Sequence, residues 1–247
     1  MAAIRTRPSP NFGPRPGGTA IDTLVLHYTG MRTAAEALDR LCDAAAQVSA
    51  HYLVEEDGTV WRLVEEDMRA WHAGMSWWQG ETNLNDRSTG IEIVNPGHEF
   101  GYRPFPPAQM AAVAALCRDI LARRPIPPAR VLGHSDIAPM RKLDPGELFD
   151  WRGLAAQGIG LWPATPGPAA APGPGADEDS AAATAIAGLA AIGYDTEGRS
   201  AGRAVDSDAA LTAAIAAFQR RFRPGRVDGA LDSETCALIA AVARLCG

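Results

Sequence analysis

The chain has 247 residues, of which 47% are hydrophobic and 21% are charged, with a formal net charge of −6 at pH 7. These values are typical of a soluble globular protein and exclude a mainly disordered chain. The acidic balance excludes nucleic acid as an expected partner, and no run approaches the roughly 20 apolar residues of a membrane-spanning segment.

The first eighteen residues contain three arginines and four prolines, with no apolar segment before a small-residue cleavage site. This pattern does not match a secretory signal peptide. The sequence as written therefore indicates a cytoplasmic location, and the periplasm or an association with the outer membrane is the alternative. Nothing in the sequence implies an oligomer.

Alternating strand and helix signals fill the first two thirds of the chain. An apolar run predicts a strand near residues 22–29, which carries His27 at its carboxyl end. A capping box and helical spacing predict a helix over 33–46. Strands interleaved with helices predict an α/β domain, a mixed β-sheet flanked by helices. The further expected elements are a hairpin of 51–54 and 59–64, a strand over 90–94, a helix over 107–123 and a strand over 130–133 that leads into His134.

A segment rich in proline, glycine and alanine, residues 163–176, divides the chain. Such a composition is typical of a semi-flexible spacer. We therefore expect two independently packed domains, residues 1–162 and residues 177–247. The second should be a small helical module, with helices near 180–192, 207–221 and 232–245.

Three side chains suggest a metal centre. A hydrolytic zinc site takes three protein ligands from imidazole or carboxylate groups. His27 and His134 each end a predicted strand, and Asp144 follows in a loop that can fold back toward them. Taken alone this pattern is weak, because a histidine is more often a hydrogen-bonded structural residue than a metal ligand.

Four segments strengthen the hypothesis. They are LHYTG (26–30), SAHYLVEEDGTVWRLVEEDMRAWHAG (49–74), LNDRSTGIEIVN (84–95) and GHSDIAPMRKLDPG (133–146). In this order they resemble the type 2 N-acetylmuramoyl-L-alanine amidases, which are zinc enzymes of the α/β class. The resemblance implies hydrolysis of the amide bond between N-acetylmuramic acid, including its 1,6-anhydro forms, and L-alanine in peptidoglycan or muropeptides. It also implies a role in cell-wall turnover and recycling.

The resemblance implies a role for each matching polar residue. His27, His134 and Asp144 match the zinc ligands, Glu92 matches the general base, and Lys142 matches the group that stabilises the oxyanion. Glu92 has an alternative as a solvent-facing strand residue, and Lys142 as an ordinary surface lysine. Some family members use a tyrosine where this chain has Ala50, so the proton transfer is expected to depend on Glu92.

Substrate-binding candidates come from the same segments. His51 is either close to substrate or held by an internal hydrogen bond. Trp71 and His72, together with Trp77 and Trp78, are expected to line a groove and stack on sugar or stem peptide, and the alternative is that they are core residues. His98 matches no family role.

The tail resembles the type 1 peptidoglycan-binding domain, a three-helix module. The resemblance rests on IGYD (192–195), AIAAFQRRFRP (214–224) and VDGALDSET (227–235), with Asp232 where many members have glycine. It implies binding of wall polymer, and the alternative is a helical cap on the first domain.

Two other functions compete with the amidase. Inactive peptidoglycan recognition proteins commonly lack a metal ligand, whereas all three candidate ligands are present here. A zinc peptidase that cuts the stem peptide would use similar chemistry, but the HExxH motif is missing.

Overall fold

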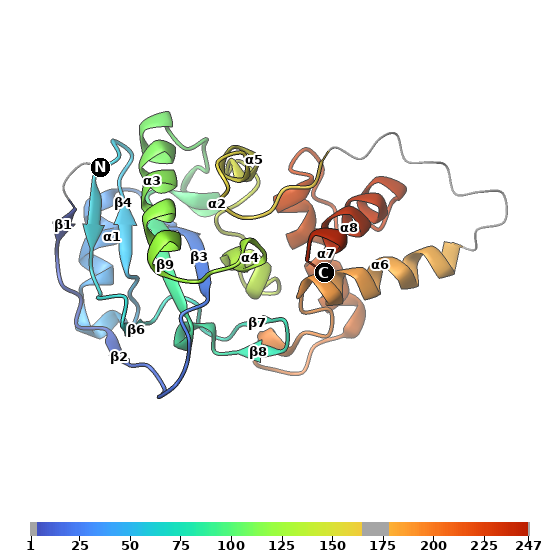
Figure 1. The fold of residues 1–247 in the computed structure, drawn as a ribbon, viewed down its shortest axis with the longest axis horizontal. Helices are drawn as coiled ribbons and strands as arrows, with labels where there is room; N and C mark the ends of the chain where they lie inside the picture. Colours follow the sequence, from blue (N-terminus) through green and yellow to red (C-terminus); the bar gives the residue numbers. More distant parts are fainter. Residues whose placement is uncertain (1–3, 165–177, 247) are drawn as a thin grey trace.

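A six-stranded mixed sheet forms the centre of the first domain in the computed structural model, which describes residues 4–164 and 178–246 (Figure 1). The strand order is β1-β5-β4-β9-β3-β10, and β9, β3 and β10 run parallel to one another. The expected mixed sheet is confirmed. The strands of this sheet are β1 (Arg5–Thr6), β3 (Thr23–Tyr28), β4 (Tyr52–Val54), β5 (Val60–Arg62), β9 (Ser88–Ile93) and β10 (Val131–Gly133).

Two small antiparallel pairs lie outside the central sheet, β2 with β6 and β7 with β8. None of these strands was expected from the sequence, because each has only two or three residues and shows no usable period. Their bounds are β2 (Phe12–Pro14), β6 (Met68–Ala70), β7 (Trp77–Trp78) and β8 (Glu81–Thr82).

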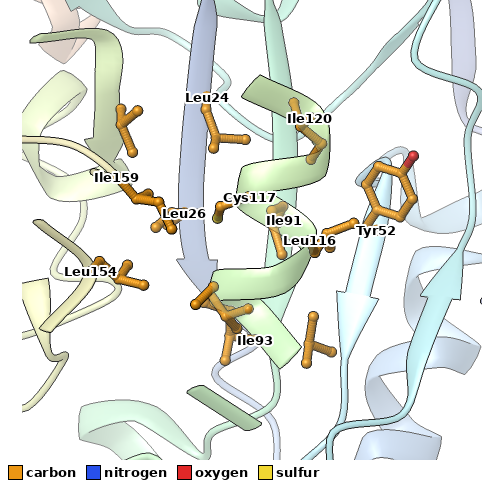
Figure 2. Close-up of a cluster of buried hydrophobic side chains, with 14 of the residues drawn as sticks. Leu24, Leu26, Tyr52, Ile91, Ile93, Leu116, Cys117, Ile120, Leu154 and Ile159 are labelled. Atoms are coloured by element: carbon orange, nitrogen blue, oxygen red, sulfur yellow. The ribbon is translucent and has the colours of Figure 1, made fainter. Parts of the chain in front are cut away.

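Helix α3 (Pro107–Arg123) covers one face of the sheet, as Figure 2 shows. Its apolar side packs on β3 and β9, whose alternate side chains point to the same face. The predicted bounds of this helix, 107–123, are confirmed. The fully buried contacts in this layer include Leu24, Leu26, Ile91, Ile93, Leu116, Cys117 and Ile120.

Helix α1 (Ala34–Leu41) covers part of the opposite face, where it packs on Leu53 and Val94. The helix was expected to continue to residue 46 but ends five residues earlier. The Asp43 carboxylate accepts a hydrogen bond from the Ala45 amide and so caps a separate 3₁₀ turn, η1 (Ala44–Ala46). Aspartate competes in this way with helix continuation.

The remaining helices are short elements of the first domain and the long helices of the tail. The tail helices match the sequence prediction to within two residues at each end. None of the helices in the described part of the chain is both long and apolar enough to cross a bilayer. The remaining elements are η2 (Leu84–Asp86), α2 (Gly97–Phe100), η3 (Pro128–Arg130), α4 (His134–Ile137), α5 (Trp151–Ala155), α6 (Glu178–Ile192), η4 (Arg199–Ala201), α7 (Ser207–Phe222) and α8 (Ser233–Cys246).

The tail helices pack directly against the first domain (Figure 1). One buried cluster contains Val25 of β3 and Leu132 of β10 together with Leu189 and Phe218 of the tail. The expectation of two independently packed units is therefore wrong, and the helical-cap alternative describes the packing. The linker at 163–176 lies outside the described residues except for its first two positions, so the domain boundaries stay a prediction.

Trp77 and Trp78 belong to this interface. The Trp78 ring is 2% exposed and lies edge-on to Tyr194 at 5.0 Å, while the Arg199 guanidinium lies over Trp77 at 4.6 Å. Both tryptophans therefore contact the tail, which matches the core alternative for Trp78 and leaves neither among the residues that line the cavity described below.

A shared core predicts that both parts of the chain unfold together. Phe218→Ala removes a fully buried ring from the shared cluster and should lower the free energy of unfolding by about 3–5 kcal/mol. In urea denaturation followed by circular dichroism, we expect one transition shifted as a whole. Leu245→Ala, at a residue 49% exposed, is the control and should change stability by less than about 0.5 kcal/mol. Two separate transitions in the wild-type protein would contradict a shared core.

Candidate active site

Three parallel strands bring the predicted site residues to one edge of the sheet. In the register of β3 and β9, His27 lies directly beside Glu92. Strand β10 pairs with β3 up to Gly133, opposite Leu26, so His134 follows at the level of His27. Asp144 joins them from the loop after α4, where its carbonyl accepts a hydrogen bond from the Ser135 amide at 2.8 Å.

The three predicted ligands form a compact triangle of atoms. His27 Nδ1 lies 2.9 Å from His134 Nδ1, and Asp144 Oδ2 lies 3.1 Å from each of them. All three residues are buried, with at most 5% of their surface exposed. The structure thus brings together the trio inferred from sequence, and the proton positions on the two imidazoles decide what can bind between them.

The proton on His134 is fixed by a main-chain oxygen. His134 Nε2 lies 3.0 Å from the carbonyl oxygen of Ala73. A carbonyl only accepts, so a neutral His134 carries its proton on Nε2. Its Nδ1 atom therefore presents a lone pair to the centre of the triangle.

A chain of three hydrogen bonds fixes the proton on His27. The Ser88 hydroxyl donates to the Leu84 carbonyl at 2.5 Å, and it accepts from His72 Nε2 at 3.2 Å. His72 Nδ1 is then an acceptor, and it lies 3.0 Å from His27 Nε2, which donates to it. His27 Nδ1 is thereby left without a proton, like His134 Nδ1.

Electrostatics favours a neutral His27 and an ionised Asp144. Burial lowers the pKa of His27 to about 4, with a further contribution from His134. Although burial alone acts in the opposite direction, the adjacent His134 and His27 bring the pKa of Asp144 well below its usual range. The hydrogen bonds on the outer side of each imidazole thus leave two ring nitrogens and a carboxylate oxygen facing one another, a group of atoms that could hold a cation. Two imidazoles and a carboxylate suit a divalent transition metal.

Glu92 points into a cavity beside this triangle. The cavity has a volume of about 490 Å³ and is also lined by His134, Lys142 and Asp144. Glu92 is 9% exposed, and its Oε2 atom has no hydrogen-bond partner among the described residues. Burial, followed by the charge of Asp144, raises the pKa of Glu92 well above its usual value. The solvent-facing alternative for Glu92 is therefore wrong.

His51 does not reach the cavity. It has no exposed surface, its Nδ1 atom accepts from the Gly90 amide at 2.9 Å, and its Nε2 atom lies 3.1 Å from the Met68 carbonyl. Both nitrogens are thus bonded to the main chain. These contacts fit the alternative, an internal hydrogen bond, and the expected substrate contact stays a prediction.

Trp71 and His72 were also expected to bind substrate. Trp71 is not among the residues that line the cavity. His72 borders it, but both ring nitrogens are used by His27 and Ser88. The contacts of His72 therefore serve His27, and its stacking on a substrate stays a prediction.

Several residues of the quoted motifs have roles that the sequence reasoning did not assign. The Asn85 side chain accepts from the main-chain amides of His72 and Ala73 at 3.0 and 2.8 Å. These bonds fix the backbone of the two residues whose ring nitrogen and carbonyl oxygen set the proton positions on the imidazoles. A Cβ at Gly90 would lie 2.5 Å from the His72 ring, so only glycine fits there. The occurrence of both residues within the quoted LNDRSTG segment was the available signal.

His98, which had no expected role, also lines the cavity. Its Nδ1 atom lies 3.0 Å from the Tyr28 hydroxyl, and its Nε2 atom lies 3.1 Å from Glu147. The ring stacks on Tyr102 with centroids 4.4 Å apart. These contacts hold the His98 ring in place at the wall of the cavity.

Comparison with known proteins agrees with this geometry. Residues 17–147 match the type 2 family described as N-acetylmuramoyl-L-alanine amidase. The chain is 40% identical over 237 residues to the N-acetylmuramoyl-L-alanine amidase AmiD of Escherichia coli, covering 90% of this chain and 82% of that protein. It is 34% identical over 161 residues to the 1,6-anhydro-N-acetylmuramyl-L-alanine amidase AmpD of Haemophilus influenzae, covering 58% of this chain and 85% of that protein.

Solved structures give the same assignment over nearly the whole length. A complex of E. coli AmiD with anhydro-N-acetylmuramic acid-L-Ala-D-γ-Glu-L-Lys superposes with a TM-score of 0.78 at 38% identity, covering 94% of this chain and 92% of that one. AmpDh3 of Pseudomonas aeruginosa with an anhydromuramic pentapeptide gives 0.73 at 31% identity, covering 98% and 97%. The chain therefore belongs to the type 2 N-acetylmuramoyl-L-alanine amidases and hydrolyses the amide bond between N-acetylmuramic acid and L-alanine.

Proposed function

We propose that this amidase holds Zn²⁺ with His27, His134 and Asp144 and acts on muropeptides, including 1,6-anhydro forms, in cell-wall turnover and recycling. The observation that carries the proposal is the triangle of three proton-free acceptors with sides of 2.9–3.1 Å. The anhydromuropeptides bound to the two solved relatives support the choice of substrate.

Zinc in such a site supplies Lewis-acid polarisation of the scissile carbonyl and lowers the pKa of a water molecule. The protein supplies the proton transfers. The Glu92 carboxylate accepts a proton from the attacking water and returns it to the amine of L-alanine as the carbon–nitrogen bond breaks. Its unpartnered Oε2 atom in the cavity is free to take that proton, and its raised pKa suits a group that must first accept and then donate.

Lys142 stabilises the negative oxygen that develops on the scissile carbonyl. Its amide donates to the Ala138 carbonyl at 3.0 Å, which holds the loop of residues 138–144 in a tight turn. The side chain lines the same cavity as Glu92 and is half-buried. A positive charge placed where negative charge develops lowers the barrier more in a water-poor site than it would in bulk water.

The domain roles form part of the proposal. Residues 1–162 carry the catalytic site, residues 163–176 are the linker, and residues 177–247 contact wall polymer. The resemblance of the tail to the type 1 peptidoglycan-binding domain supports the last role. The tail packs closely on the catalytic domain, so a polymer held by the tail would lie at a fixed position relative to the site.

The substrate assignment is tested with a purified anhydromuropeptide. The zinc-loaded protein should release a free peptide that begins with L-alanine, detected by mass spectrometry. A chelator such as 1,10-phenanthroline should stop the release, and added Zn²⁺ should restore it. Cleavage inside the peptide would instead indicate a peptidase, and undiminished turnover after complete metal removal would contradict the zinc centre.

Glu92→Gln tests the proton transfer. The amide keeps the shape of the side chain but cannot take a proton, so kcat should fall by about 100- to 10,000-fold, while the zinc content measured by atomic emission stays the same. Glu99→Gln is the matched control, because Glu99 lines the same cavity but is exposed, and it should keep kcat within a few-fold of wild type. Equal activity of Glu92→Gln and wild type would assign the base to another residue.

Ser88→Ala tests the hydrogen-bond chain behind His27. Without the hydroxyl, the His72 Nε2 proton has no acceptor and His72 no longer prefers the form that accepts from His27. Zinc affinity, measured by competition with a chromogenic chelator, should fall by about tenfold. Ser49→Ala is the control, since Ser49 is equally buried and bonds to Asn11 and Trp71 instead. A similar loss of affinity in both variants would show a general effect of destabilisation.

A further inference from the structure

A buried carboxylate lies two residues after the predicted zinc ligand His134. Asp136 is 1% exposed and belongs to the short helix α4. Its Oδ2 atom accepts from the amide of Gly133 at 2.8 Å. This bond joins the third residue of α4 to the amide of Gly133, the residue just before the helix. It therefore fixes the backbone from which the His134 side chain projects.

The tail of the chain satisfies the rest of this carboxylate. Arg221 of α7 donates from Nη1 to Asp136 Oδ2 at 2.9 Å, and the Tyr194 hydroxyl donates to Asp136 Oδ1 at 2.7 Å. Arg221 is 5% exposed and Tyr194 is 2% exposed. Burial, followed by the charge of Asp136, raises the pKa of Tyr194 well above its usual value, so the hydroxyl remains a donor.

Arg221 is itself held on both sides of the interface. Its guanidinium lies over the Trp151 ring of the catalytic domain at 4.1 Å and over Phe222 of its own helix at 4.9 Å. A buried ion pair in this setting has little access to water, so loss of one partner leaves the other as an unpaired buried charge. Asp136 without Arg221 would have to turn toward water, and the Gly133 amide bonded to it would follow.

A metal site is sensitive to such a movement. Ligand atoms must lie within about 0.2 Å of their ideal metal distances for strong binding, and groups that orient a ligand affect affinity although they never touch the metal. We propose that Arg221 and Tyr194 are positioning residues of the metal centre, which act through Asp136 and the Gly133 amide on His134. The tail helices are then a structural part of the catalytic site as well as a candidate wall-binding module. This inference rests on the proposed zinc centre.

Zinc affinity of the full chain tests the inference. Arg221→Met keeps the length and apolar stem of the side chain but removes the charge. The dissociation constant for Zn²⁺, measured by competition with a chromogenic chelator, should rise by about tenfold. Tyr194→Phe removes a single hydroxyl and keeps the ring against Trp78, so it should fold and shift the constant in the same direction by less.

Arg223→Met is the matched control. Arg223 follows Arg221 by two residues, and its ion pairs with Asp232 and Glu234 lie inside the tail. It should lower the melting temperature without changing zinc affinity. Unchanged affinity in both Arg221→Met and Tyr194→Phe, with both folded by circular dichroism, would overturn the inference and leave the zinc centre intact. Equal losses in Arg221→Met and Arg223→Met would also overturn it. A wild-type chain that does not bind zinc would instead overturn the proposed centre, and the inference with it.

Discussion

The parallel pairing of β3 with β9 and β10 is the constraint on which the site depends. Because the carboxyl ends of parallel strands meet at one edge, residues far apart in sequence, His27, Glu92 and His134, arrive at the same level. Asp144 is then needed only to complete the set from a loop anchored at Ser135. The fold thus sets the positions of the side chains, and the surrounding hydrogen bonds set which nitrogen of each imidazole carries the proton.

Those hydrogen bonds act from the outer side of each imidazole. Ala73 and His72 accept hydrogen bonds from the Nε2 atoms of His134 and His27, so the Nδ1 atoms of both histidines face inward. The Asn85 side chain accepts hydrogen bonds from the main-chain amides of His72 and Ala73 and so fixes the backbone of both residues. The WHAG and LND segments therefore have one common physical role. They order the imidazole protons around the proposed metal centre, while the Oε2 atom of Glu92 has no hydrogen-bond partner among the described residues.

The sequence predicts the sheet and the long helices well, because periodicity is a local signal, and its motifs name the three side chains that the fold brings together as a possible metal site. It predicts poorly what depends on packing between distant segments. His51 and His72 lie in one of the segments that resemble the family, yet only the folded chain shows that their ring nitrogens are already bonded. The tail was expected to stand apart because of its linker, and nothing local to Trp78 or Phe218 indicates that they share one core.

That shared core limits how such enzymes can diversify by recombination. From the sequence alone, a crossover within residues 163–176 would be expected to leave stability unchanged, because it does not interrupt either folded part. In this protein it would replace the partners of Trp78 and Asp136 at once. A foreign tail would have to provide both an apolar surface and a cation at matching positions. Exchange of the tail in this protein should therefore require coordinated changes on both sides of the junction.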